Sequence, residues 1–350
     1  MSLGPLGAAI SRRHLHLLVS SMSARGRAIS VGPRVVRILR EGGWDVQVTV
    51  TTPDDDPTSV AHRLGDGASG DPTDPSSART RPPVPESGPA LVGALGGDGY
   101  ISAVAEGLAG TGGVLVPLPG GRGNDLCRAI GAGADPVARA RSLAGLGLLG
   151  AGEGQSDLPA ERLRGLDGIW VQEAGEGVDE RADEGDPHRL VLGVVSFGLE
   201  AWANIIANGS RLRSGPLAYA YGALAAPIRF HQADFRAVLD GVPHEMGGWA
   251  LSVSNSGCIG GGIRIVPSSD PFDGVLEAFH VGHMPLRAAL PVLARVVAKR
   301  DAEDPAVEVL SVHEMVVTEP VGMPAMADGD QVGTIPLRIS VAPAVVDVLI

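Results

Sequence analysis

Two glycine-rich loops, one strand apart, constrain this chain more than any other feature of its sequence. The first, Gly96-Gly97-Asp98-Gly99, follows the apolar run "ALVGAL" and precedes a segment with helical periodicity that reaches about Leu108. The second, "GGRGND" at 120–125, follows "VLVPLP" and also leads into a helical segment. A strand, a glycine loop and a helix in this order direct backbone N–H groups and a helix N-terminus at an anion. We therefore predict an α/β unit that binds phosphate groups.

Each loop carries one aspartate, Asp98 in the first and Asp125 in the second. A carboxylate beside a phosphate requires a cation between them, and Mg²⁺ is the usual one. Binding of a magnesium nucleotide therefore explains the glycines and the aspartates together. Neither loop has the P-loop lysine or a full dinucleotide fingerprint, and a single GGDG turn is more often structural.

The rest of the chain predicts two domains with a cleft between them. Residues 14–19, 35–39 and 44–52 have the patterns of a strand, a helix and a strand, which is a βαβ start. From about residue 189 onward, alternating apolar runs predict an antiparallel β domain with helices at about 216–228 and 285–299.

Two low-complexity regions interrupt this order. Residues 53–89 are rich in Asp, Pro, Ser and Gly and predict a disordered insertion. Residues 150–188 are acidic and partly of low complexity around "ERLRGLDGIWVQEA".

Charge and composition exclude several classes of function. The net charge of −12 argues against nucleic acid as a partner. Lys299 is the sole lysine, so anions must be bound by arginine or backbone N–H groups. No apolar run approaches the ~20 residues of a membrane span. With two cysteines and no secretory signal, we expect a cytoplasmic setting.

The glycine segments resemble the catalytic domain of the soluble diacylglycerol kinase family, which includes bacterial lipid kinases and sphingosine and ceramide kinases. The family pattern is GGDGT followed by P-x-G-T-x-N-D-[FL]-A-R, and the chain has "GGDGY" and "PLPGGRGNDLCRAIG". Further similar segments follow in register: "RLRGLDG", "VVSFGLEA", "NSGCIGGGIRIVPSSDPFDGVLE" and "MADGD".

The resemblance implies a phosphofructokinase-like α/β nucleotide-binding domain and a C-terminal β-rich, sandwich- or barrel-like lipid-binding domain, with the active site between them. On this basis we expect the first domain at 1–140, joined by the C-terminal segment 325–350. The substrate domain is expected at 141–324.

The resemblance also assigns roles to residues. Asp328 of the "DGD" segment corresponds to the carboxylate that deprotonates the lipid hydroxyl, and Asp330 accompanies it. Asp98, Asp125 and Asp167 correspond to the aspartates that organise magnesium and ATP. The expected nucleotide-binding residues are Ser23, Gly26, Gly96, Gly97, Asp98, Gly99, Gly121, Arg122 and Asn124.

Departures from the family pattern leave the activity open. Tyr100 and Arg122 replace two loop threonines, and Asp330 replaces the family's glutamate. Arg122 can either bind ATP phosphates or block their site. The alternative interpretation of Asp328 is purely structural: it would be a turn residue, because Asp-Gly is common in hairpin turns.

The sequence therefore favours a kinase that uses ATP and Mg²⁺ to phosphorylate a lipid hydroxyl, on diacylglycerol or a relative such as a sphingoid base. The alternatives are a catalytically weakened nucleotide- or lipid-binding relative and, with less support, an NAD kinase-like enzyme. The lipid substrate predicts peripheral association with the membrane surface. The oligomeric state is open, a homodimer included.

Overall fold

The computed structural model describes residues 13–66, 89–149, 162–174, 188–209, 231–297 and 307–350, together with Gly222 and Ala226. The chain divides into two compact units. Unit 1 comprises Met1–Leu166 and Ala344–Ile350, and unit 2 comprises Asp167–Pro343.

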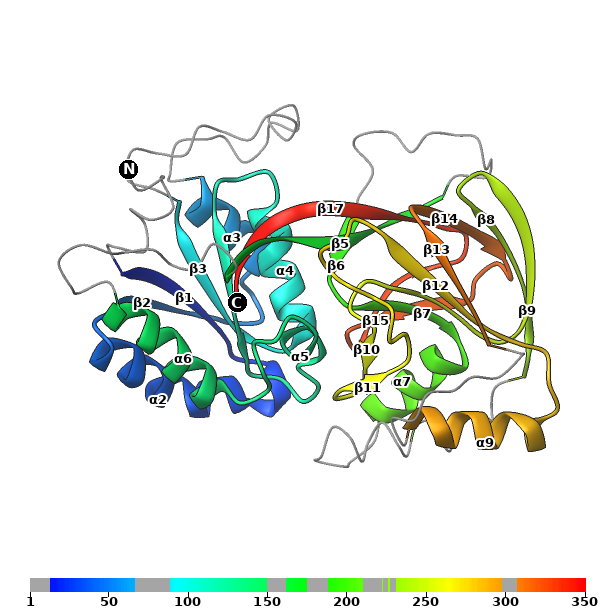
Figure 1. Ribbon diagram of the computed structural model, residues 1–350, viewed down its shortest axis with the longest axis horizontal. Coiled ribbons are helices and arrows are strands. Elements are labelled where there is room, and N and C mark those ends of the chain that lie inside the picture. The colour runs from blue at the N-terminus through cyan, green and yellow to red at the C-terminus, as the bar shows by residue number, and fades with distance from the viewer. Residues whose placement is uncertain are drawn as a thin grey trace. The chain divides into compact units, whose positions relative to one another are not determined.

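Unit 1 is built on a parallel sheet with the strand order β17-β4-β3-β1-β2 (Figure 1). Its strands are β1 (His14–Ser20), β2 (Asp45–Thr51), β3 (Leu91–Gly96), β4 (Val114–Pro119) and the end of β17 (Leu337–Leu349). Its helices are the 3-10 turn η1 (Ser23–Arg25), α2 (Arg27–Glu41), α3 (Pro57–Gly65), α4 (Asp98–Leu108), α5 (Asp125–Ala129) and α6 (Pro136–Leu149).

The central strands β3 and β4 are buried along their whole length, as expected for parallel strands. Alternate side chains of β1, Leu15, Leu17 and Val19, pack into one core with apolar residues of α2 and α6. All four strands β1 to β4 run in the same direction, so their carboxyl ends meet at one edge of the sheet. The two glycine loops follow β3 and β4 at that edge.

Unit 2 is antiparallel, with the main strand order β16-β15-β7-β9-β8-β14-β17. The bounds are β5 (Leu163–Glu173), β6 (His188–Val191), β7 (Val194–Gly198), β8 (Ala233–Leu239), β9 (Val242–Ser254), β10 (Cys258–Ile259), β11 (Ile263–Arg264), β12 (Leu276–Gly282), β13 (Val307–Val312), β14 (Glu314–Glu319), β15 (Pro324–Ala327) and β16 (Asp330–Thr334). Its helices are α7 (Leu199–Gly209) and α9 (Leu286–Val297).

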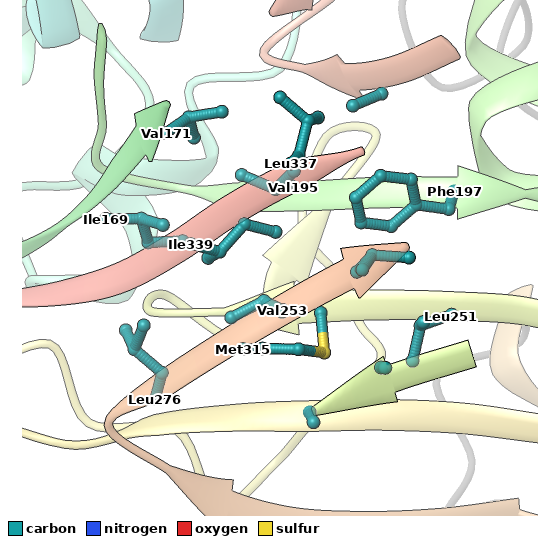
Figure 2. Close-up of a cluster of buried hydrophobic side chains, with 14 of the residues drawn as sticks. Ile169, Val171, Val195, Phe197, Leu251, Val253, Leu276, Met315, Leu337 and Ile339 are labelled. Carbon is teal, nitrogen blue, oxygen red and sulfur yellow. The ribbon is translucent and has the colours of Figure 1, made fainter. Parts of the chain in front are cut away.

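The core of unit 2 is formed by strands that are distant in sequence. Figure 2 shows Val195, Phe197, Leu251, Met315 and Leu337 converging in one buried cluster. The mixed α/β first unit and the β-rich second unit confirm the predicted fold class.

The unit boundaries differ from those expected from the sequence. Helix α6 packs into the α/β core, so residues 141–149 belong to unit 1. Strands β15 and β16 pair with each other and with β7, so 325–343 belong to unit 2. The return to unit 1 is made by 344–350, where Asp347 and Val348 pair with β4.

The prediction of disorder over 53–89 is wrong for its first part. Pro57–Gly65 form α3, whose N-terminus is capped by Asp56 through hydrogen bonds from the backbone N–H groups of Thr58 and Ser59. Residues 67–88 lie outside the described residues, as do nearly all of the expected helix at 216–228 and much of 150–188. Helix α9 matches the stretch expected at 285–299. In the described part of the chain, no helix is long and apolar enough to cross a membrane.

Candidate functional site

The first glycine loop is held by the turn that follows β1. The backbone N–H of Gly97 donates a 3.0 Å hydrogen bond to the Ser23 hydroxyl. Gly26, with a φ of +86°, ends the Ser23–Arg25 turn and starts α2, and this left-handed conformation favours glycine. Ser23 and Gly26 therefore belong to the same loop cluster as Gly97, although they lie more than seventy residues earlier in the chain.

The two glycine loops touch each other directly. A Cβ on Gly121 would lie 2.5 Å from the Cα of Gly97, so glycine is required there. Asn124 adopts a left-handed conformation and accepts a 2.8 Å hydrogen bond from the Gly121 N–H, which closes the second loop on itself. Sequence reasoning missed Arg27, whose guanidinium donates to the Gly121 carbonyl at 3.1 Å.

Asp98 and Asp125 lie in the first turns of α4 and α5, and both are close to Gly123. A Cβ on Gly123 would lie 2.7 Å from Asp125 Oδ2 and 3.2 Å from Asp98 Oδ2, so the two carboxylates flank the same glycine. Asp98 Oδ1 accepts a hydrogen bond from the Leu126 N–H at 3.1 Å.

This pair of carboxylates suits magnesium delivered with a nucleotide. Mg²⁺ is usually held by one or two carboxylates together with substrate phosphates, rather than by a cage of protein ligands. Among the described residues there is no group of three or more His, Cys, Asp or Glu side chains placed to hold a metal. Ser21, at the same edge of the sheet, has a buried hydroxyl without a hydrogen-bond partner in the described structure, and a polar ligand would satisfy it.

The Tyr100 ring turns away from the second glycine loop. Its hydroxyl lies 3.0 Å from Thr51 Oγ1 at the end of β2, and the ring covers Gly96, where a Cβ would overlap it. Burial raises the pKa of Tyr100 to about 12. Arg122 is exposed and forms no hydrogen bond or ion pair with any described residue. Gly99, the remaining predicted loop residue, lies in the first turn of α4.

Asp167 is the first residue of unit 2. Its side chain is buried, and its Oδ2 accepts a 2.7 Å hydrogen bond from the Gly274 N–H. Asn255 donates from Nδ2 to the backbone carbonyl of Asp167 at 2.9 Å. The buried Oδ1 of Asn255 has no hydrogen-bond partner in the described part of the chain. One oxygen of the Asp167 carboxylate therefore holds the turn at Gly274.

Asp328 lies in the two-residue turn between β15 and β16. Asp328 and Gly329 have φ values of +52° and +96°, as a tight hairpin turn requires. The carboxylate lies near Gly193, just before β7: a Cβ on Gly193 would lie 2.7 Å from Asp328 Oδ1 and 4.0 Å from the Ser256 hydroxyl. Asp328 is therefore a turn residue whose side chain is directed at a buried polar segment.

Asp330, by contrast, is exposed at the start of β16. Its carboxylate lies 3.8 Å from an Arg189 nitrogen, and the side chains of Arg189 and Asp330 are 43% and 68% exposed. An ion pair of this kind contributes little to stability. Sequence reasoning missed Gly193, because only the pairing of distant strands brings it to Asp328.

The comparisons with known proteins agree with this division. A model of the diacylglycerol kinase catalytic domain matches residues 14–148, and a model of the YegS C-terminal NAD kinase beta sandwich-like domain matches residues 193–350. The chain belongs to the diacylglycerol kinase-like family of lipid kinases. It is a divergent, bacterial-type member. Because lipid kinases transfer a phosphoryl group, the chain is placed among the transferases. The NAD kinase relation concerns the fold of the second domain.

Two curated relatives of this family are diacylglycerol kinases of Mycobacterium tuberculosis strains CDC 1551 / Oshkosh and ATCC 25618 / H37Rv. Each is 26% identical over 260 residues, which cover 73% of this chain and 74% of the relative. A solved diacylglycerol kinase structure from Bacillus anthracis strain Sterne matches with a TM-score of 0.66 at 16% identity, over 96% of both chains. A second structure from that strain matches with a TM-score of 0.68 at 17% identity, over 96% and 97%. These structures support the fold.

Proposed function

We propose that this protein transfers the terminal phosphoryl group of ATP, with Mg²⁺, to a hydroxyl of a lipid, either diacylglycerol or a relative such as a sphingoid base. The observation that carries the proposal is the contact of the two glycine loops around the Asp98 and Asp125 carboxylates. Phosphoryl transfer requires positioning and charge neutralisation more than covalent chemistry. Loops rich in amides beside two carboxylates supply both.

The loop residues are proposed to bind the nucleotide. The Ser23 hydroxyl and the Gly97–Gly121 contact set the loop geometry, and the N-terminus of α4 favours negative charge beside it. The full proposed set is Ser23, Gly26, Gly96, Gly97, Asp98, Gly99, Gly121, Arg122 and Asn124. Because Tyr100 bonds Thr51 and Arg122 is exposed, both substitutions are compatible with an active kinase.

Bound magnesium would neutralise phosphate charge, and Asp98 and Asp125 are the side chains that would hold it. The resemblance also assigns Asp167 to magnesium, and we retain Asp167 as a further candidate to hold the ion.

Asp328 is the proposed general base. The lipid oxygen forms a bond to phosphorus as the bond to the ADP oxygen breaks, and the hydroxyl proton passes to the Asp328 carboxylate. The charge of the exposed Asp330 is proposed to assist only weakly, by less than about threefold in kcat.

The test is turnover of ATP with diacylglycerol and sphingosine in mixed micelles, with and without Mg²⁺. We expect phosphorylated lipid from the wild type and a loss of at least a hundredfold in Asp98→Asn and Asp328→Asn. Activity that survives both substitutions would contradict the assigned roles. Calorimetric binding of ATP without turnover would instead favour the weakened, non-catalytic relative. Analytical sedimentation tests whether the protein is a homodimer. Liposome flotation tests whether it binds the membrane surface.

A further inference from the structure

The sheet of unit 2 has a polar face opposite the apolar core. Val195, Phe197, Leu251 and Val253 point into the core drawn in Figure 2. Because side chains alternate along a strand, Ser196 and its neighbours lie on the other face.

Two serines on this face are direct cross-strand partners. Ser196 of β7 pairs with Ser252 of β9. Both hydroxyls donate to one carboxyl oxygen, Oε2 of Glu200 in the first turn of α7, at 3.1 Å from Ser196 and 2.5 Å from Ser252. Two independent strands therefore fix the position of a single carboxyl group.

The other oxygen of Glu200 is not used within the described structure. Among the described residues, no group is hydrogen-bonded to Oε1, and no basic side chain forms an ion pair with the carboxyl. The residue as a whole is partly exposed. Burial raises the pKa of Glu200, which favours the protonated carboxyl. With Oε2 occupied by two donors, Oε1 is the oxygen that would carry the proton and donate it.

The carboxyl group also lies close to the proposed base, within the same unit. Met326 of β15 pairs with Ser196, and Asp328 follows two residues later, in the turn that ends β15. Because paired residues of neighbouring strands share a face, Ser196 and Met326 lie on the same face of the sheet.

The surroundings of Glu200 are apolar. Leu199, Trp202 and Ala203 of the same helix pack with Trp249 in one cluster. A polar group fixed at the edge of an apolar cluster matches a lipid, which joins acyl chains to a small polar headgroup.

We propose that Glu200 determines headgroup specificity, with Oε1 donating a hydrogen bond to the ester carbonyl of a neutral acylglycerol next to the hydroxyl that is phosphorylated. This proposal rests on the proposed lipid kinase function. It predicts that the enzyme prefers diacylglycerol to sphingosine, because a cationic ammonium beside a neutral donor would be unpaired.

The substitution Glu200→Gln tests whether Glu200 acts as a neutral hydrogen-bond donor or as an ionised carboxylate. Glu200→Gln keeps a carbonyl oxygen for the two serines and an amide N–H in place of the protonated oxygen, whereas Glu200→Ala removes both. We expect KM for diacylglycerol to stay within about twofold of the wild type in Glu200→Gln and to rise about tenfold in Glu200→Ala, the effect of one hydrogen bond. KM for ATP should be unchanged in both.

Glu277 provides the matched control. It is another buried carboxyl on a strand of unit 2, bonded to the Ser269 hydroxyl at 2.5 Å. Glu277→Gln should leave KM for both lipids unchanged, and thermal unfolding of all variants reports their folding.

Several outcomes would overturn the inference. An unchanged diacylglycerol KM in Glu200→Ala would do so. A Glu200→Gln variant as impaired as Glu200→Ala would do so as well, because it would indicate an ionised carboxylate that selects an ammonium group.

If the wild type phosphorylates neither lipid, the proposed function fails. The inference is then judged by micellar diacylglycerol binding, followed by Trp202 and Trp249 fluorescence: weaker binding in Glu200→Ala alone supports it, and equal binding contradicts it.

Discussion

The carboxylate of Asp98 accepts a 3.1 Å hydrogen bond from the backbone N–H of Leu126, which ties the first turn of α4 to the first turn of α5. This bond uses Oδ1, while Oδ2 lies on the side of Gly123 and Asp125. One side chain therefore both joins the two glycine loops and contributes charge where the phosphates are proposed to bind.

The substitution Asp98→Asn separates the hydrogen bond of this side chain from its charge. Asp98→Asn retains an acceptor for Leu126 but removes the charge, so we expect stability within about 1 kcal/mol of the wild type. Lipid phosphorylation should fall by about a hundredfold or more, as when a preorganised electrostatic group is lost. Asp98→Ala should show the same kinetic loss with a further loss of stability. Denaturant unfolding and steady-state kinetics measure the two effects.

Asp135 offers a control for this experiment. Its carboxylate caps α6 by accepting from the N–H groups of Val137 and Ala138. Asp135→Ala should cost about 1 kcal/mol of stability, the usual value for a lost cap, with little change in kcat. If it impairs turnover as much as Asp98→Asn does, the effect of Asp98 is general destabilisation.

The contact between Gly97 and Gly121 makes a second prediction. In Gly121→Ala the new Cβ would lie 2.5 Å from the Gly97 Cα, so the loops must separate. We expect a stability loss of about 1–3 kcal/mol and a much weaker affinity for ATP, measured by calorimetric titration.

Gly145→Ala is the matched control, because a Cβ there meets nothing within 4 Å and the position is helical. It should stabilise the protein by about 0.5–1 kcal/mol and leave ATP binding unchanged. Normal ATP affinity in Gly121→Ala would show that the loop contact is not part of the nucleotide site.

Local signals in the sequence predicted the first unit better than the second. The loops around Asp98 and Asp125 follow fully buried strands, so their pattern is visible in ten or fifteen neighbouring residues. The direction of the Tyr100 ring was not predictable, because it depends on Thr51 at the end of another strand. The same holds for Asp328, whose neighbour Gly193 is brought close by the pairing of β15 with β7.

The unit boundary was also misplaced for a physical reason. Strand β17 continues through Pro343 and Ala344, pairing with β14 in unit 2 and with β4 in unit 1. The run is interrupted at Pro343 and at Ala344, which has a φ of +45°, but one proline inside a long apolar run does not by itself identify a domain boundary.

Tyr100 makes a prediction about pH. Burial raises its pKa from an ordinary value of 10.0 to about 12 in the folded protein, so the unfolded chain loses the proton first. The free energy of unfolding should therefore fall as pH rises from 10 toward 12, by up to about 2–3 kcal/mol from this group. Tyr100→Phe should lose about 1 kcal/mol at pH 8 with the Thr51 bond, yet show a shallower decline above pH 10. Parallel slopes for the two proteins in urea unfolding would contradict the buried position of the phenol.

Asp328 and Asp330 are two residues apart, yet the structure predicts opposite outcomes for them. Asparagine tolerates the left-handed conformation of Asp328, so Asp328→Asn should fold normally. Its kcat should nevertheless fall by about 10²–10⁴-fold, the usual contribution of a general base. Asp330 is exposed and paired with Arg189 at only 3.8 Å, so Asp330→Asn should change kcat by less than about threefold and stability by less than about 0.5 kcal/mol. The two variants, assayed with the same lipid micelles and checked by thermal unfolding, separate a directed carboxylate from a nearby charge. Equal losses in both would assign the effect to the hairpin as a whole, and full activity in Asp328→Asn would remove it as the base.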